Sequence, residues 1–277
     1  MHGTKNRDAF KLYLEAERLF TVVDEVKMAE SRAKFETVTR MDPEYARAWG
    51  WRSYTQVRSV LRGWLDDSKM GVAEGWAREG VRLDEYDFAT HWDLAFYLLN
   101  NGDHGGAIDH YRIGIDLYDN ETDLLDRKPG ILAEAAEGYL HAGDPKTAIT
   151  LLLRATKIPD WYRWNLGFAY YQDKQTDEAI DVLGSMRSRP GDWSYVPDSD
   201  LFMAVALYRK AQALQALHAD EAARMMETAI EKIRIFRSSN AAYSLGDCLN
   251  HRSRFKDKKD ENYWFEPLQD LWNKSEK

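Results

Sequence analysis

The stretch from 161 to 183 limits what this chain can fold into more than any other part of the sequence. A leucine–glycine pair ends at Gly167, Tyr170 follows one turn later, and the small Ala179 precedes the large Leu183 by four residues. Residues four apart lie on one face of a helix, so Ala179 and Leu183 indicate the inner face of a second helix. Gly167 allows that helix to approach the first closely. The stretch therefore predicts a helix pair, which needs further pairs stacked beside it to bury its apolar face.

The same small-then-large frame can be placed at six points along the chain. The large inner residues are Phe35, Ala77, Tyr111, Leu152, Leu183 and Met226. Neighbouring positions are 42, 34, 41, 31 and 43 residues apart. A period of about 34 residues is typical of helix–turn–helix repeats, and the longer intervals indicate inserts in three connections. The sequence thus predicts about six degenerate repeats over residues 1–237 and a C-terminal tail over 238–277.

Proline, glycine and polar clusters place the boundaries within this array. The predicted segments are a second helix at 27–40, a second repeat at 46–83 whose second helix begins at 68, a third repeat at 89–117, a polar insert at 119–128, a loop at 187–198 and a sixth repeat at 199–237. Gly102 suits the left-handed residue that ends a helix in the turn of the third repeat.

The frame resembles that of the tetratricopeptide repeat (TPR) family, in which a Leu-Gly-x-x-Tyr pattern on the first helix precedes an Ala-x-x-x-aromatic pattern on the second. The resemblance implies an all-α fold, a right-handed α-solenoid of stacked helix–turn–helix repeats with about twelve to fourteen helices. In the tail, an amphipathic segment at 264–272 is expected to form a capping or interaction helix.

Two terminal segments are similar to those of degenerate TPR arrays in bacterial class III adenylate/guanylate cyclases and related signalling proteins. Residues 6–14, with an Asn-x-x-Ala-aromatic-x-x-Tyr-Leu pattern, resemble the opening of such arrays. Residues 254–257, Arg-Phe-Lys-Asp, resemble their closing segment, although Lys258 stands where the proline would be. No cyclase catalytic domain is present, so the resemblance implies only a regulatory or docking role.

Composition excludes several classes of function. The formal net charge of −8 argues against nucleic acid, which requires a basic footprint. The single cysteine, Cys248, excludes a disulfide within the chain and a thiolate zinc site. No apolar run approaches the roughly 18 residues of a membrane span, and the N-terminus lacks the apolar core of a signal peptide. We therefore expect no membrane insertion and a cytoplasmic location.

The polar residues do not form a catalytic or metal-binding motif. No His-Glu-x-x-His pattern occurs, and His104 and His110 are six residues apart, which puts them on different helical faces. The acidic pair Asp66-Asp67 suits a helix cap better than acid–base chemistry. Glycines at 102–106 indicate a turn, since neither a strand nor a Gly-Lys-Ser/Thr sequence accompanies them. We expect no catalytic residues, no metal and no cofactor, and therefore no enzyme.

Aromatic residues occupy the first-helix positions that line the concave groove of such arrays. The candidate partner-binding residues are Arg47, Trp51 and Tyr54 in the second repeat, Trp92, Asp93 and Phe96 in the third, and Trp164, Asn165, Phe168 and Tyr171 in the fifth. Large rings supply contact area at low entropic cost. The alternative interpretation is that most of these residues form the core between repeats.

The sequence predicts a non-catalytic scaffold or regulatory module that binds a protein or peptide segment, centred on Trp92, Trp164 and Tyr171. Glu134 and Glu137 favour a basic or neutral segment over an acidic one. The alternative is a small-molecule-sensing domain or an unrecognised enzyme that uses the same groove as a pocket. Self-association through the C-terminal helix is compatible with either, because the end of an array must be capped or paired.

Overall fold

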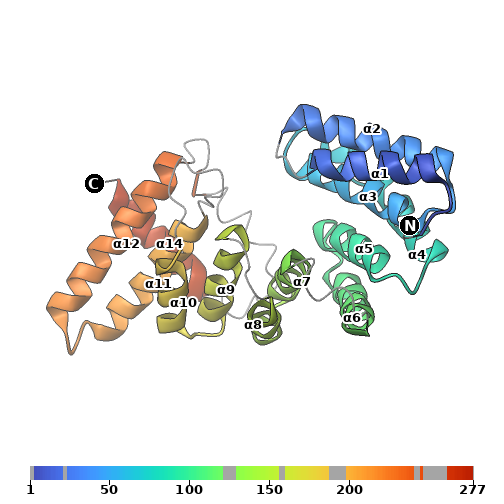
Figure 1. The fold of residues 1–277 in the computed structure, drawn as a ribbon. Helices are drawn as coiled ribbons and strands as arrows, with labels where there is room; N and C mark the ends of the chain where they lie inside the picture. The colour runs from blue at the N-terminus through green and yellow to red at the C-terminus, as the bar shows by residue number, and fades with distance from the viewer. Residues whose placement is uncertain are drawn as a thin grey trace. The chain divides into compact units, whose positions relative to one another are not determined.

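The computed structural model describes residues 3–20, 24–120, 129–155, 160–186, 198–239, 244–245 and 261–276. These residues contain thirteen α-helices, one short 3-10 helix and no strand. Figure 1 shows the helices in chain order. The chain folds as two compact units, Met1–Asp126 and Arg127–Lys277. The boundary between them falls in the polar insert predicted between the third and fourth repeats. No helix of the described ranges is long and apolar enough to cross a membrane.

The first unit consists of three helix pairs. They are α1 (Arg7–Phe20) with α2 (Glu25–Met41), α3 (Ala46–Leu61) with α4 (Val72–Leu83), and α5 (Phe88–Asn100) with α6 (His104–Asn120). A 3-10 helix, η1 (Asp67–Lys69), lies between α3 and α4. The predicted start of the second helix at residue 68 is therefore wrong by four residues. Asp66 accepts a hydrogen bond from Ser68 N (2.9 Å), and this cap starts the separate short turn.

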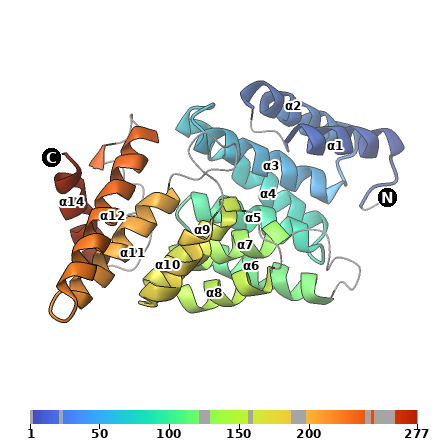
Figure 2. The same ribbon diagram turned by 60° about the vertical axis from the view of Figure 1, so that its left-hand side comes forward.

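The second unit has three further pairs and one additional helix (Figure 2). The pairs are α7 (Pro129–His141) with α8 (Pro145–Arg154), α9 (Asp160–Gln172) with α10 (Thr176–Gly184), and α11 (Asp198–Leu214) with α12 (Ala219–Ser239). The additional helix, α14 (Glu261–Ser275), packs against both α11 and α12. The boundary expected at 237/238 lies in the last turn of α12, and the segments 187–197 and 254–257 lie outside the described residues.

The six helix pairs coincide with the six predicted repeats, and the predicted frame forms their core. The small residues Ser31, Ala73, Ala107, Ala148, Ala179 and Ala222 are all buried. The large residues of the frame are buried too, except Met226, which is half-buried. A third inner position follows three residues after each large one, as Val38, Gly80, Gly114, Ala155, Met186 and Ala229. These positions form one inward-facing stripe along each second helix, which extends just past the ends of α8 and α10 at Ala155 and Met186.

Local sequence explains where the helices begin and turn. Asp24, Asp103 and Asp144 each precede a second helix and accept a hydrogen bond from the backbone N–H three residues on, which caps that helix. The turns inside the third and fourth repeats place Gly102 and Gly143 at positive φ, as predicted for Gly102. The fifth repeat makes the same turn with Lys174, at φ 63°.

The predicted close approach at Gly167 is confirmed. A Cβ atom at this position would lie 2.4 Å from Cγ of Leu183 on α10, which is far inside van der Waals contact. Tyr170, the ring expected to fill the next turn, is half-buried, whereas the adjacent Tyr171 is 1% exposed. The helix pair that the sequence indicates most strongly thus packs through its glycine and leucine.

Candidate functional site

An aromatic cluster joins the first helices of the N-terminal unit. The rings of Tyr54 on α3 and Phe96 on α5 lie 4.3 Å apart. Arg58, one turn after Tyr54, holds its guanidinium 5.4 and 5.1 Å from these two rings and donates from Nη2 to the Tyr54 hydroxyl (3.0 Å). Trp51 contacts Tyr54 and also Phe20 of α1, at 5.5 and 5.0 Å. The cluster combines four aromatic side chains with one cation.

Much of this cluster is interior rather than surface. Tyr54 and Phe96 are buried, and Trp92 is 5% exposed because it packs edge-on against Tyr111 of α6, at 5.0 Å. Trp51 and Arg58 are half-buried. Within the N-terminal unit, Phe20, Trp51 and Arg58 are therefore the groups of this cluster that an approaching segment could reach.

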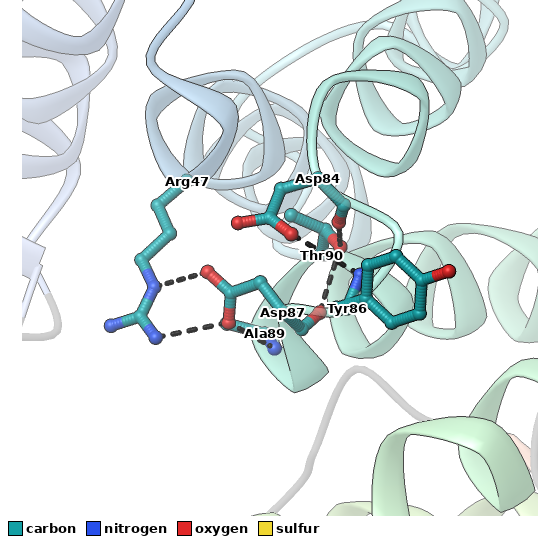
Figure 3. A network of polar contacts seen from close by, with 6 residues as sticks. All are labelled: Arg47, Asp84, Tyr86, Asp87, Ala89 and Thr90. Carbon is teal, nitrogen blue, oxygen red and sulfur yellow. Dashed lines mark hydrogen bonds and ion pairs between the residues drawn. The ribbon is translucent and has the colours of Figure 1, made fainter. Parts of the chain in front are cut away.

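Arg47 ties α3 to the start of α5, as Figure 3 shows. Its guanidinium makes a bidentate ion pair with Asp87, with Nη2 2.9 Å from Oδ1 and Nε on the other oxygen. The same Asp87 carboxylate accepts from Ala89 N (3.0 Å) and caps α5, while Thr90 Oγ1 donates to the Asp84 carbonyl (2.8 Å). A planar pair of this kind fixes orientation, so Arg47 orients α3 relative to α5.

Asp93 is also held inside the unit. Its carboxylate lies directly over the backbone of α3, where a Cβ on Gly50 would come within 2.1 Å of Oδ2. The side chain is buried. Asp93 thus packs α5 onto α3, and an approaching segment would have to displace it to reach its oxygens.

A second aromatic cluster joins first helices in the C-terminal unit. Trp164 and Phe168, one turn apart on α9, both stack on Phe202 of α11, with centroids 5.4 and 4.1 Å apart. Phe168 and Phe202 are buried, and Trp164 is half-buried at the side of the stack. Tyr171 is buried on the same helix. Trp164 is therefore the residue of this cluster whose side chain remains partly exposed.

Asn165, next to Trp164, is 0% exposed, and neither of its amide atoms has a hydrogen-bond partner in the described part of the chain. Gln172, two turns along the same face of α9, also has a buried Oε1 with no partner there. On α7, Glu137 lies 3.8 Å from His141 Nε2, and Glu134 is buried one turn before. The first helices α7 and α9 thus carry buried or partly buried polar groups in addition to the aromatic residues of α9.

Sequence reasoning missed a histidine pair in the N-terminal unit. His91 and His110 bring their Nδ1 atoms to 2.9 Å, and His91 Nε2 lies 2.9 Å from the Glu85 carbonyl oxygen. A carbonyl only accepts, so a neutral His91 donates through Nε2 and His110 donates to His91 Nδ1. Burial, His91 and Arg78 lower the pKa of His110. Their separation of nineteen residues crosses a helix turn and matches no motif spacing, which is why the pattern gave no signal.

Phe20 and Phe202 were missed as well, because each belongs to a repeat next to the one whose aromatic it contacts. Trp92 and Trp164 belong to different units, so the single aromatic wall expected to contain both stays a prediction. No group of three or more potential metal ligands occurs within the described ranges. An open depression of about 400 Å³ lies apart from both clusters, lined by Arg234, Arg237, Ser275 and Glu276.

No protein-family model and no curated protein matches this sequence. Among solved structures, the APC/C hetero-tetramer Cut9–Hcn1 matches with a TM-score of 0.57 at 18% identity, over 89% of this chain and 46% of that chain. YrrB, a TPR protein with an unusual peptide-binding site, matches with 0.51 at 14% identity, over 75% and 96%. The C-terminal part of a TPR repeat-containing protein from Cytophaga hutchinsonii matches with 0.50 at 15% identity, over 96% and 94%.

This chain therefore spans less than half the length of the Cut9–Hcn1 chain and nearly all of the Cytophaga fragment. The helix pairs of the described ranges agree with these likenesses to helix-repeat proteins. The chain has the fold of a tetratricopeptide-repeat array.

Proposed function

We propose that this chain is a non-catalytic protein–protein interaction module whose first helices bind a segment of a partner protein. The observation that supports this most is Trp164, half-buried beside the Phe168–Phe202 stack. A ring that is rigid and only partly covered offers contact area without further loss of conformational entropy. Such anchors usually dominate the energy of an interface.

The likeness to YrrB, which has a peptide-binding site, supports a peptide or an extended protein segment as the occupant. The N-terminal unit offers Trp51 and Arg58 to such a segment, and the C-terminal unit offers Trp164 together with the acidic residues of α7. The cation of the first surface favours an acidic segment, and the carboxylates of the second favour a basic one.

The wider role remains part of this proposal. The similarity of residues 6–14 to the opening of cyclase-associated arrays favours a regulatory or docking function in a bacterial signalling protein of the cytoplasm. The small-molecule alternative has one observation in its favour, the Asn165 amide beside Trp164. A bound segment also accounts for that amide.

Self-association through the C-terminal helix has less support. Leu268, Leu271 and Trp272 of α14 are buried against its own unit. Its exposed residues in the described range include Glu266, Gln269 and Asn273, which are polar. An end helix with a polar outer face acts as a cap.

The test is affinity capture with the intact chain, followed by measurement of the captured partner's Kd for purified variants. Trp164→Ala should weaken binding by about thirtyfold, the effect typical of an interface anchor worth about 2 kcal/mol. Tyr86→Ala is the matched control, because Tyr86 is 75% exposed in the turn before α5. Unchanged binding by a normally folded Trp164→Ala, or an equal loss with Tyr86→Ala, would contradict the proposal.

A further inference from the structure

The side chain of Asn165 is buried at an unusual cost. It lies in the middle of α9, where no cap or turn requires an asparagine, and it is 0% exposed. Neither Oδ1 nor Nδ2 has a hydrogen-bond partner within the described ranges. Leaving a buried polar group unpaired destabilises the folded chain relative to pairing it. An unpaired buried amide of this kind is suited to form its hydrogen bonds with a bound ligand.

The other faces of α9 indicate where Asn165 points. Gly167 faces Leu183 of α10, and Trp164 with Phe168 faces α11. Asn165 and Gln172 are seven residues apart and so share a further face of the helix. Helices α7 and α8 are the other neighbours of α9. The buried Oε1 of Gln172 has no partner in the described part of the chain either.

The neighbouring helix α7 carries acidic side chains. Glu134, Glu137 and His141 follow one another at spacings of three and four, so they form one stripe along α7. Glu134 is buried, and Glu137 and His141 are in contact at 3.8 Å. The stripe carries two carboxylates, in a chain whose formal net charge is −8.

We propose that the α7–α9 surface recognises a basic extended segment of the partner. A peptide group of the segment pairs with the Asn165 amide, whose Nδ2 donates to its carbonyl and whose Oδ1 accepts from its N–H. A lysine or arginine side chain of the same segment lies against Glu134 and Glu137. An acidic segment would bring like charges together there, so the carboxylates also select against it. This inference rests on the proposed function, because it assigns chemistry to the segment that Trp164 anchors.

The test compares three pooled libraries of short peptides, otherwise random, in which two central residues are fixed as lysine, glutamate or glutamine. Binding of each pool to the intact chain is measured for the parent, Asn165→Leu, the double variant Glu134→Gln/Glu137→Gln, and Trp164→Ala. Glu178→Gln on α10 is the matched control, because Glu178 is exposed on a second helix. Thermal unfolding is recorded for every variant.

The parent should prefer the lysine pool to the glutamate pool by about tenfold or more, and the double variant should lose most of that preference. Asn165→Leu should weaken binding of every pool by about tenfold while its Tm stays equal or rises, since the substitution removes an unpaired amide. Glu178→Gln should behave as the parent. Binding and stability thus change in opposite directions only if the amide serves the ligand.

The outcomes separate this inference from the proposed function. A lower Tm for Asn165→Leu would mean that the amide already pairs inside the folded chain, and would overturn the inference. Binding that depends on Trp164 but shows no basic preference, or is unaffected in Asn165→Leu, would also overturn it and leave the proposed function standing. If no pool binds the parent better than Trp164→Ala, both fail.

Discussion

At the scale of single residues, three side chains adopt a strained backbone conformation or an unfavourable environment. Lys174 adopts the left-handed conformation that Gly102 and Gly143 provide in the equivalent turns. Asn165 holds an amide in the interior, and His110 holds an imidazole against another imidazole. Each of these residues gives a measurable consequence for stability.

Replacing Lys174 with glycine should stabilise the C-terminal unit by about 1 kcal/mol, because a non-glycine residue at positive φ is strained by roughly that amount. The free energy of unfolding in urea measures it. Gly143→Ala, at the equivalent turn, should be destabilising instead. A Lys174→Gly variant less stable than the parent would show that the lysine side chain contributes more than its backbone strain costs.

Acidification should destabilise the N-terminal unit through His110. Its folded pKa is lowered by burial, by His91 and by Arg78, so the unfolded chain takes up the proton more readily. Stability is therefore lost as pH falls below the ordinary histidine pKa of about 6.5 toward the lowered value. Between about pH 7.5 and 5.5, the free energy of unfolding measured in urea should fall less steeply for His110→Gln than for the parent. Equal slopes of unfolding free energy against pH for the two proteins would mean that the folded chain does not lower the pKa of His110.

At the scale of helices, the second helix of each repeat carries an inward-facing stripe, and the fifth repeat adds the close contact of Gly167 with Leu183. The small and large frame residues could be read from the sequence because four-residue spacing maps directly onto one helical face. The third inner position could not be predicted, because the residues that occupy it, such as Gly80, Ala155 and Met186, share no chemical character. The 3-10 turn before α4 was missed, since a polar stretch does not distinguish a short turn from a helix start.

Gly167→Leu should destabilise the C-terminal unit by about 1–3 kcal/mol, because the new side chain would occupy the space of Leu183. Thermal or urea unfolding measures the change. Gly184→Ala is the control, as its Cβ would meet Met203 at an ordinary 3.7 Å. If Gly167→Leu unfolds like the parent, α9 and α10 do not pack through this glycine.

The cap helix α14 should contribute to folding rather than only to binding. Leu271 is fully buried where α14 meets α11 and α12, so Leu271→Ala should cost about 2–5 kcal/mol. Asn273→Ala, on the exposed side of the same helix, should change the unfolding free energy little. Equal stability of the two variants would mean that α14 does not cap the array.

At the scale of the whole chain, the sequence predicted the repeat number and the fold because a period near 34 residues survives the loss of individual consensus residues. It predicted less of the site. A first-helix aromatic can face solvent or the next repeat, and the sequence pattern is the same for both. Phe202 covers Phe168 from the next repeat, and Tyr111 packs on Trp92 from the second helix of the same repeat.

The central claim is that the first helices bind the partner, and hydrogen exchange of the intact chain with and without the captured partner tests it most directly. Binding slows exchange of the helical segments that it covers or stabilises. The account predicts the strongest added protection in α9 and α7, with a weaker effect in α11, and none in the outer turns of α8, α10 and α12. Protection confined to those second helices would contradict it.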